Sequence, residues 1–536
     1  MCDHHGHRRA AALEDGHAHD QDHHAWTRRD FLLRTGLGTA AAVTIGATKA
    51  YALDGGSLFG RLSSLDTDRV LVLIQLSGGN DGLNTIVPVR NDLYYNARPT
   101  LALRASDTIS LTEDVGMHSR LAPLESVWQS GDMAIVHGVG YDDSSLSHFA
   151  ATDTWSTSRA SPDRDTGGWV GGALRTSFPT YEDALPEHPP AVQIGAYNPL
   201  LFQDGESDLS MRLANTSLLE QIVAGGGLYD EDDVPATPSG AELGFVRALS
   251  NASNLYLGAV QEAGGQGENA ADYPDSRLAE HLAAVARLIK GGLDSRVYLV
   301  SLGGFDTHAN QLDRHEALMD TLGGAVAAFQ SDLDASGDAE RVLTMTFSEF
   351  GRRVQENGSS GTDHGTAAPL FAFGKGVEGG FFGDVPDLAT LDGTGNISHS
   401  TDFRSVYAAA LGSWLGLEDE PLRSILGGTY DPVGFVSPRR GVASESGPDR
   451  GPTLSPPSPN PLRHTATVAF SLAEPGPARI DLFDIRGRRI ARLADGTFSA
   501  GSHLAVLEAG RLPSGSYVLR LEAGGQQRSV QAVIVR

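Results

Sequence analysis

Runs of apolar residues that end in glycine and polar residues recur along the middle of the chain. The first runs from Val70 to Leu76, is almost wholly aliphatic, and stops at a Ser-Gly-Gly-Asn turn. Comparable runs stand at 133–136, 297–302, 342–347 and 369–373. Continuous apolar runs of this length are typical of strands buried on both faces of a parallel sheet.

Amphipathic stretches with helical spacing separate these runs, near 208–224, 242–262, 276–290 and 309–333. Strands that alternate with helices imply right-handed crossovers. The pattern therefore predicts an α/β fold, a doubly wound and mostly parallel sheet with helices on both faces. Residues 151–295 are more than one βα unit needs, and we expect an insertion packed on the sheet.

The end of the chain follows a different pattern. Residues 437–460 are rich in Pro, Ser and Gly and are typical of a linker. Beyond them, apolar and polar residues alternate at 465–472, 478–484, 502–507, 516–522 and 529–535, with turns such as Asp495-Gly496 between strands. This predicts a small all-β sandwich, Ig-like in architecture.

The N-terminal residues are typical of an export signal. The pair Arg28-Arg29 precedes an alanine-rich apolar stretch at 37–47, and Ala50-Tyr51-Ala52 is a small-residue cleavage site. The stretch is too short for a spanning helix, so we expect no transmembrane segment in the mature chain. The predicted organisation is a twin-arginine signal at 1–52, an α/β domain at 53–436, a linker at 437–460 and a sandwich at 461–536.

Charge and cysteine content exclude several classes of function. The net charge is -26, and residues 53–436 hold 22 Lys and Arg against 53 Asp and Glu. An acidic surface argues against nucleic-acid binding, and we expect no nucleic-acid partner. The one cysteine, Cys2, lies in the predicted signal. A metal site in the mature chain would therefore use His, Asp, Glu and backbone oxygen.

Acidic residues and histidines follow the predicted strands. Asp81 follows the first run, Asp306 and His308 the third, and Glu349 the fourth; Asp363 and His364 precede the last. Taken singly, each of these residues is equally typical of a turn or of an exposed surface. Because the carboxyl ends of parallel strands share one edge of a sheet, the set together predicts a metal site there.

Two further positions are candidates for chemistry. Ser144 or Ser145 is a plausible helix N-cap, which would place Ser147 in the first turn, where an anion can bind and a hydroxyl can act as nucleophile. The alternative for these serines is simple capping. Arg352, with its neighbour Arg353, is either an anion clamp or an ordinary surface pair.

Several motifs together resemble a known family. SGGNDGLNT, SHFAATDTW, GGFDTH, FSEFGRR, DHGTA and TDFRSVYAAALGSWLG resemble the family catalogued as domain of unknown function 1501, over about residues 68–430. That family is similar to the alkaline phosphatase and sulfatase superfamily. The resemblance implies a doubly wound sheet, usually two divalent metal ions, and a Ser, Thr or formylglycine nucleophile acting on phosphate or sulfate esters.

The resemblance also implies roles for individual residues. Asp81, Asp306, His308 and His364 would ligate metal, Ser147 would be the nucleophile, and Glu349 would replace the aspartate of an Asp-His-Gly element. Phe350 stands where that element has histidine and cannot ligate, so one site is incomplete or Asp363 compensates. We therefore expect one or two divalent ions (Zn, Mn, Mg or Ca).

The expected substrate is a small-molecule or polymer-borne ester. The formylglycine motif of sulfatases is absent, because its nearest counterpart has Ala160 at the position that must be Cys or Ser. Phosphate esters are therefore favoured over sulfate esters. The alternative is a non-catalytic secreted or cell-surface binding protein that retains the fold.

The tail motifs SPNPL, LFDIRGRRIARL and LPSGSYVLRLEAGG resemble the C-terminal sorting domain of Por (type IX) secretion substrates. This resemblance implies type IX secretion to the cell surface or the medium, after the Tat transport into the periplasm that the twin-arginine pattern predicts. The alternative for the tail is a generic Ig-like module that binds surface glycan.

Overall fold

The computed structural model describes residues 43–45 and 67–436, apart from 161–166, 180, 182–184, 206, 215 and 217–237, and then much of 452–534. Short gaps in the last range are 455–456, 458–461, 463–464, 473–474, 485–487, 500, 509, 511, 514 and 525. The chain divides into two compact units, Met1–Pro438 and Arg439–Arg536. The predicted linker and most of the predicted signal lie outside the described residues.

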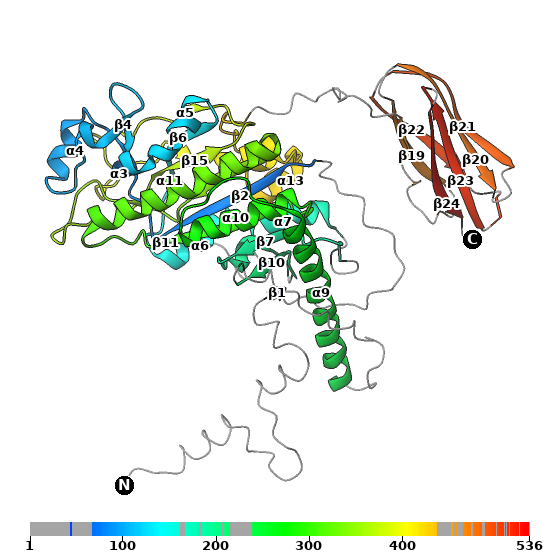
Figure 1. The fold of residues 1–536 in the computed structure, drawn as a ribbon, viewed down its shortest axis with the longest axis horizontal. Helices are drawn as coiled ribbons and strands as arrows, with labels where there is room; N and C mark the ends of the chain where they lie inside the picture. The colour runs from blue at the N-terminus through cyan, green and yellow to red at the C-terminus, as the bar shows by residue number, and fades with distance from the viewer. Residues whose placement is uncertain are drawn as a thin grey trace, which may run out of the picture. The chain divides into compact units, whose positions relative to one another are not determined.

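A long, mostly parallel sheet runs through the first unit (Figure 1). Its strand order is β1 (Val43–Ile45), β10 (Ser210–Leu213), β7 (Ala191–Ile194), β11 (Val297–Gly303), β2 (Val70–Ser77), β12 (Val342–Phe347), β15 (Ala368–Phe373), β6 (Met133–Gly140) and β16 (Gly380–Phe382), and β17 (Thr401–Asp402) also pairs with β6. Strands β10, β7, β11, β2 and β12 are parallel neighbours. β15 runs antiparallel to both β12 and β6, and β1 antiparallel to β10.

Strand β2 shows why these apolar runs form central strands. Successive side chains point to opposite faces of a strand. Val72 and Ile74 join one buried cluster, and Leu71 and Leu73 join another on the opposite face. Since helices cover both faces, the positions from Val70 to Ile74 are all buried, and the run there is continuous rather than alternating.

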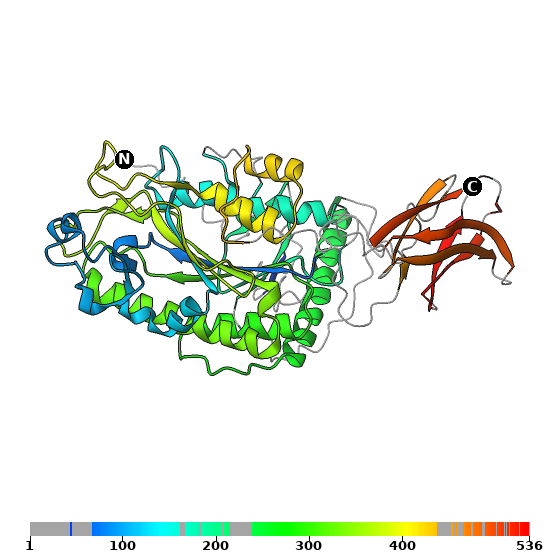
Figure 2. The same ribbon diagram turned by 90° about the horizontal axis from the view of Figure 1, so that it is seen from above.

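The two faces are covered by different helices (Figure 2). Helices α10 (Arg277–Lys290) and α11 (Gln311–Ser336) pack on the face of Val72, with α9 (Pro238–Gln266) against α10. The other face is covered by α7 (Trp169–Ser177), α12 (Phe403–Ala408) and the π-helical η6 (Ala409–Trp414). The predicted fold class, a doubly wound and mostly parallel sheet, is confirmed.

Shorter elements connect this frame. They are α3 (Gly82–Thr85), β3 (Ile86–Val87), α4 (Asp92–Ala97), η2 (Ala105–Asp107), β4 (Thr108–Ser110), β5 (Gly116–His118), η3 (Ser119–Leu124), α5 (Glu125–Gln129), α6 (His148–Thr157), α8 (Pro199–Phe202), β8 (Gln203–Asp204), β9 (Ser207–Asp208), η5 (Ala339–Arg341), β13 (Gly351–Arg352), β14 (His364–Gly365) and α13 (Asp419–Leu426).

Two expectations about 151–295 are wrong. The predicted helix at 208–224 begins as strand, since Ser210–Leu213 forms β10. The region is also not an insertion laid on a finished sheet, because β7 and β10 belong to the sheet and pair beside β11. The helices expected near 242–262, 276–290 and 309–333 correspond to α9, α10 and α11.

The second unit is all-β. One sheet has the order β18 (Thr453–Leu454), β19 (Thr465–Leu472), β22 (Gly501–Glu508), and the other β21 (Arg489–Phe498), β20 (Gly476–Asp484), β23 (Gly515–Ala523), β24 (Gln526–Ile534). Side chains of both sheets share one buried cluster, so the predicted small sandwich is confirmed. The turn expected at Asp495-Gly496 is wrong, because both residues pair with β20 inside β21.

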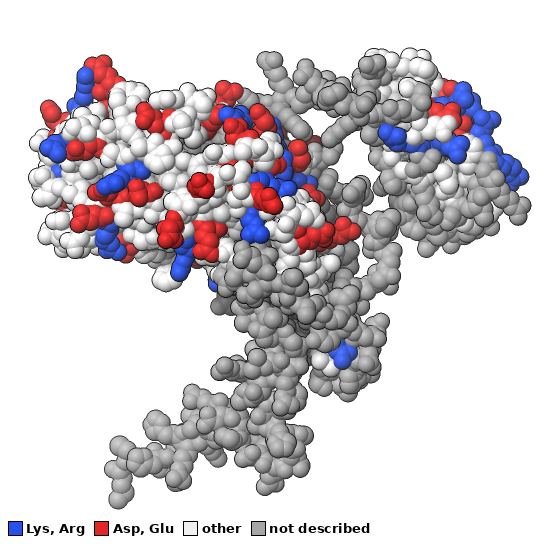
Figure 3. Space-filling view, in the orientation of Figure 1, with Lys and Arg blue, Asp and Glu red and all other residues white. Residues whose placement is uncertain are grey.

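Charged residues are interspersed on the visible face of the first unit, where Asp and Glu lie between Lys and Arg rather than in one large patch (Figure 3). Among the described residues, no helix is both long and apolar enough to cross a membrane.

Candidate metal centre

The candidate site lies at the carboxyl edge of the sheet, where β2, β11 and β12 end side by side. Gly78, directly after β2, has φ +121°, and a Cβ there would stand 2.3 Å from the backbone nitrogen of Asp306. Glycine is therefore required for the turn after β2 to approach the turn after β11 so closely. The approach brings residues that follow different strands to one place.

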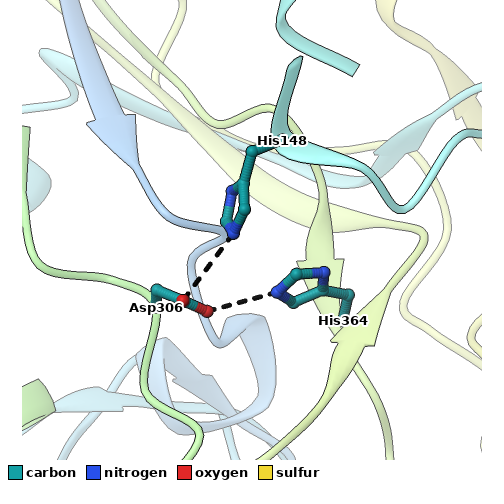
Figure 4. A group of neighbouring side chains, drawn as sticks. All are labelled: His148, Asp306 and His364. Carbon is teal, nitrogen blue, oxygen red and sulfur yellow. Dashed lines mark hydrogen bonds and ion pairs between the residues drawn. The ribbon is translucent and has the colours of Figure 1, made fainter. Parts of the chain in front are cut away.

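Three side chains converge there (Figure 4). One ligand atom from each of His148, Asp306 and His364 lies within 4.8 Å of the others. His364 Nε2 is 3.2 Å from Asp306 Oδ1, and His148 Nε2 is 3.7 Å from Asp306 Oδ2. Imidazole nitrogen and carboxylate oxygen suit zinc and neighbouring divalent metals, so this donor set fits the expected ion.

A fourth donor, His308, lies against two members of this group. Its Nε2 is 3.0 Å from Asp306 Oδ1 and 3.0 Å from His364 Nε2. Its Nδ1 is 3.0 Å from Asp363 Oδ1, which also accepts a hydrogen bond from Asn357. Asp363 thus touches the outer side of the His308 ring. We call His148, Asp306, His308 and His364 the open cluster.

Asp306 is ionised at any ordinary pH. Partial burial opposes ionisation, but the hydrogen bond from Arg352 and the positive charge of its guanidinium outweigh it and lower the pKa of Asp306 to about 2. The side chain is nevertheless 48% exposed. The cluster therefore presents a permanent negative charge that solvent, an ion or a substrate can reach.

Glu349, which follows β12, lies behind the open cluster. It is buried, and its Oε1 accepts a hydrogen bond from Gly78 N at 2.8 Å and lies 2.9 Å from His148 Nδ1. Its Oε2 is buried and has no hydrogen-bond partner among the described residues. Glu349 thus contacts the site through a histidine and belongs to no group of three potential ligands in the described part of the chain.

His148 comes from the first turn of α6. No role was predicted for His148 from the sequence. The expected N-cap at Ser144 or Ser145 is wrong, because α6 starts at His148 and Ser147 is its N-cap. Ser147 is exposed, and its side chain makes no capping hydrogen bond. The only sequence signal for His148 is its place beside Ser147 in the SHFAATDTW motif.

Asp81 lies outside the open cluster. It is 1% exposed, and its Oδ2 accepts hydrogen bonds from Arg98 Nη1 at 2.6 Å and from Gln311 Nε2. Burial opposes ionisation, but the guanidinium of Arg98 holds the pKa of Asp81 below its usual value. In this arrangement Oδ2 balances a buried arginine, while the buried Oδ1 has no hydrogen-bond partner among the described residues.

The guanidinium of Arg352 is likewise hydrogen-bonded to other protein groups. Its side chain is fully buried, and its guanidinium donates to the backbone carbonyls of Gly78, Gly79, Phe305 and Thr362 and, at 2.7 Å, to Asp306 Oδ1. A guanidinium so enclosed is neither free to clamp a substrate anion nor part of a surface pair, the two roles that the sequence left open. Instead it joins the turns after β2 and β11 and orients Asp306.

The structure thus sorts the predicted residues into three sets. Asp306, His308 and His364 come together in the open cluster with His148. Glu349 and Asp363 contact its histidines from outside. Asp81 and Arg352 are buried in hydrogen-bond networks beneath it.

Comparison with known proteins identifies two segments. Residues 259–426 match the family described as protein of unknown function (DUF1501), and residues 458–536 match the secretion system C-terminal sorting domain. Both resemblances are confirmed over these residues. The DUF1501 segment contains Asp306, His308, Glu349 and His364. None of the curated proteins compared with the chain matches it.

Solved structures with a similar fold include a sulfatase from Pseudoalteromonas sp. (TM-score 0.29, 10% identity, covering 82% of this chain and 84% of that one). Another is an alkaline phosphatase superfamily protein from Vibrio parahaemolyticus (TM-score 0.32, 8% identity, covering 82% of this chain and 79% of that one). A third is a phosphonate monoester hydrolase from Silicibacter pomeroyi (TM-score 0.28, 11% identity, covering 86% of this chain and 88% of that one). TM-scores this low leave the function to be argued from the chain's own residues.

Proposed function

We propose that this protein is an exported, metal-dependent hydrolase that acts on phosphate esters through a serine nucleophile. The observation that supports it most is the convergence of His148, Asp306 and His364 within 4.8 Å beside Ser147. The donors are partly exposed, so both an ion and a substrate can reach them. A divalent ion held there would supply positive charge to the ester oxygens and acidify a nearby hydroxyl.

The chain's own groups provide the rest of the chemistry. Ser147 stands at the N-terminus of α6, where unpaired backbone N–H groups and the helix dipole favour an anionic ester. Ser147 Oγ attacks phosphorus as the ester P–O bond breaks. The serine proton passes to solvent, and the leaving alkoxide takes a proton from solvent. Water then hydrolyses the phosphoserine and restores the hydroxyl.

The match to a secretion sorting domain supports export to the cell surface or the medium. The twin-arginine pair Arg28-Arg29 makes Tat transport the proposed first step, and it lies outside the described residues. Val43–Ile45, inside the predicted signal, forms the edge strand β1 against β10. Sequencing the N-terminus of secreted protein tests whether 1–52 is removed; retention of β1 in mature protein contradicts the predicted cleavage.

The function is tested on the full chain purified without chelator. Bound metal is measured by elemental analysis, and the same sample is assayed with an aryl phosphate monoester, an aryl phosphate diester and an aryl sulfate. We expect phosphate-ester turnover that chelation abolishes. Ser147→Ala should lower turnover by at least ~10³-fold with metal content unchanged. Ser106→Ala, at an exposed serine in η2, is the matched control.

Two results would count against the proposal. Full turnover in Ser147→Ala would remove that serine as nucleophile. A folded, metal-loaded protein inert towards all three esters would instead favour the non-catalytic surface protein.

A further inference from the structure

Each histidine of the open cluster hydrogen-bonds through Nδ1 to an acceptor outside the cluster. These pairs are His148 with Glu349 Oε1 (2.9 Å), His308 with Asp363 Oδ1 (3.0 Å) and His364 with the Leu146 carbonyl (2.7 Å). Carbonyl and carboxylate oxygens only accept, so Nδ1 carries the hydrogen in all three rings. In each neutral ring, Nε2 then presents a lone pair to the cluster.

These lone pairs face one another and a carboxylate. His308 Nε2 and His364 Nε2 are 3.0 Å apart, and both lie within 3.2 Å of Asp306 Oδ1. Such an arrangement is repulsive unless positive charge lies between the atoms. A proton can bridge only one pair. Tetrahedral ligands of a zinc-sized ion stand roughly 3.3 Å apart, so a single ion suits these spacings.

We propose that the chain binds one divalent ion of the zinc type through the Nε2 atoms of His148, His308 and His364 and a carboxylate oxygen of Asp306. The ion is borderline in softness, as three imidazoles and one carboxylate require. Glu349 and Asp363 are positioning residues that hold the tautomer and direction of His148 and His308. The inference rests on the metal dependence proposed above and not on ester hydrolysis.

A second ion beside the first is disfavoured by the residues that stand there. Phe350 is buried, and its ring centroid lies 4.9 Å from that of His148 and 4.4 Å from that of His364. Gly79 leaves space for the Phe350 ring, because a Cβ at Gly79 would stand 2.5 Å from ring carbons of Phe350. On the other side, the guanidinium of Arg352 is already bonded to Asp306 Oδ1. An apolar ring and a cationic guanidinium supply no ligand for a second ion on these two sides of the cluster.

Helix α6 therefore contributes to the metal site as well as placing Ser147 at its N-terminus. It supplies a metal ligand, His148, directly after Ser147. The His364–Leu146 hydrogen bond ties the segment before Ser147 to the cluster as well. These contacts tie the residues on either side of Ser147 to the cluster.

The test measures metal binding in the full chain and needs no turnover. Zinc per chain is determined by elemental analysis, affinity by competition with a chromogenic chelator, and geometry from the visible spectrum of Co²⁺-substituted protein. We expect one ion per chain and the intense absorption of four-coordinate cobalt. His148→Ala should weaken binding by more than ~100-fold. Glu349→Gln, which keeps an acceptor for His148, should weaken it by roughly 10–100-fold at most and keep the cobalt spectrum.

His399→Asn serves as the control, because His399 lies outside the cluster, with Nδ1 3.9 Å from Asp142. It should bind zinc like the wild type. Two ions per wild-type chain, unchanged affinity in His148→Ala, or six-coordinate cobalt in the wild type would each overturn the inference. The cobalt result stands even if His148→Ala does not fold. Metal bound as expected without ester turnover would reject only the proposed hydrolysis.

Discussion

Two groups of side chains at the same edge of the sheet are built from similar residues and behave differently. The open cluster holds Asp306, 48% exposed, among histidines whose Nε2 atoms face one another. Beneath it, Asp81 is 1% exposed and bonded to Arg98 and Gln311. In the first group the carboxylate is bonded to Arg352 but keeps an exposed face, whereas in the second it is buried against Arg98.

The two groups show how a metal ligand differs from a structural carboxylate. A carboxylate that follows a strand can bind an ion or pair with a buried arginine, and the sequence around it is similar in both cases. What distinguishes them is exposure, because a guanidinium of the chain lies against both carboxylates. Asp81 is buried against Arg98, at the C-terminal end of α4, while Asp306 retains an open face beside its bond to Arg352. The following experiments test the contrast.

The largest effect is expected at Asp306. Asp306→Asn keeps an acceptor for Arg352 but removes the ligand charge, so metal affinity and any ester turnover should fall by at least ~10³-fold. The free energy of unfolding of the metal-free protein should change by less than ~1 kcal/mol, because the side chain is half exposed. Chelator competition and urea unfolding check the two values. Unaltered zinc affinity would remove Asp306 from the site.

The reverse pattern is expected at Arg98. Arg98→Met leaves the buried carboxylate of Asp81 without its cation, which should cost about 3–5 kcal/mol of unfolding free energy. Metal affinity of the folded fraction should remain that of the wild type. Urea unfolding with and without zinc measures both. If zinc affinity falls as far as in Asp306→Asn, the two groups are one site and the contrast fails.

Buried histidines give a smaller, pH-dependent effect. Burial lowers the pKa of His137 to about 4, against 6.5 in the unfolded chain. The unfolded state therefore binds the proton first on acidification, and stability present above pH 6.5 is lost towards pH 4. His137 accounts for about 2 kcal/mol of the loss between pH 7 and pH 5.

His137→Leu should remove that share, since Nε2 of His137 has no partner among the described residues. The measurement is the difference in unfolding free energy between pH 7 and pH 5, compared with wild type and His399→Asn. An equally steep acid loss in the leucine variant would show that His137 is not protonated on unfolding.

The smallest effect is expected at Asp363, more than half exposed behind His308. Hydrogen bonds from Asn357 and then from His308 hold the pKa of Asp363 below its usual value, so it is ionised at neutral pH. Asp363→Asn should weaken zinc binding about tenfold and leave one ion per chain. Chelator competition and elemental analysis check this. Loss of the ion altogether would make Asp363 a ligand rather than a positioning residue.

Much of the sheet and its covering helices was predictable from the local pattern of apolar and polar residues. The apolar runs became β2, β11, β12, β15 and β6, because burial on both faces of a sheet demands continuous apolar sequence. The helices at 276–290 and 309–333 had clear amphipathic spacing. The pattern failed at β10 and β21, whose short or polar segments become strands only through their neighbours in the sheet.

The sequence by itself determined that acids and histidines would gather at the carboxyl edge of a parallel sheet, because strand order along the chain places their turns there. Only the tertiary structure decided which of them face an open centre. Arg98 reaches Asp81, Arg352 fills the space between turns, and α6 brings His148 to Asp306. Each contact joins residues distant in the chain, and its strength depends on burial and direction, which side-chain identity and spacing do not specify.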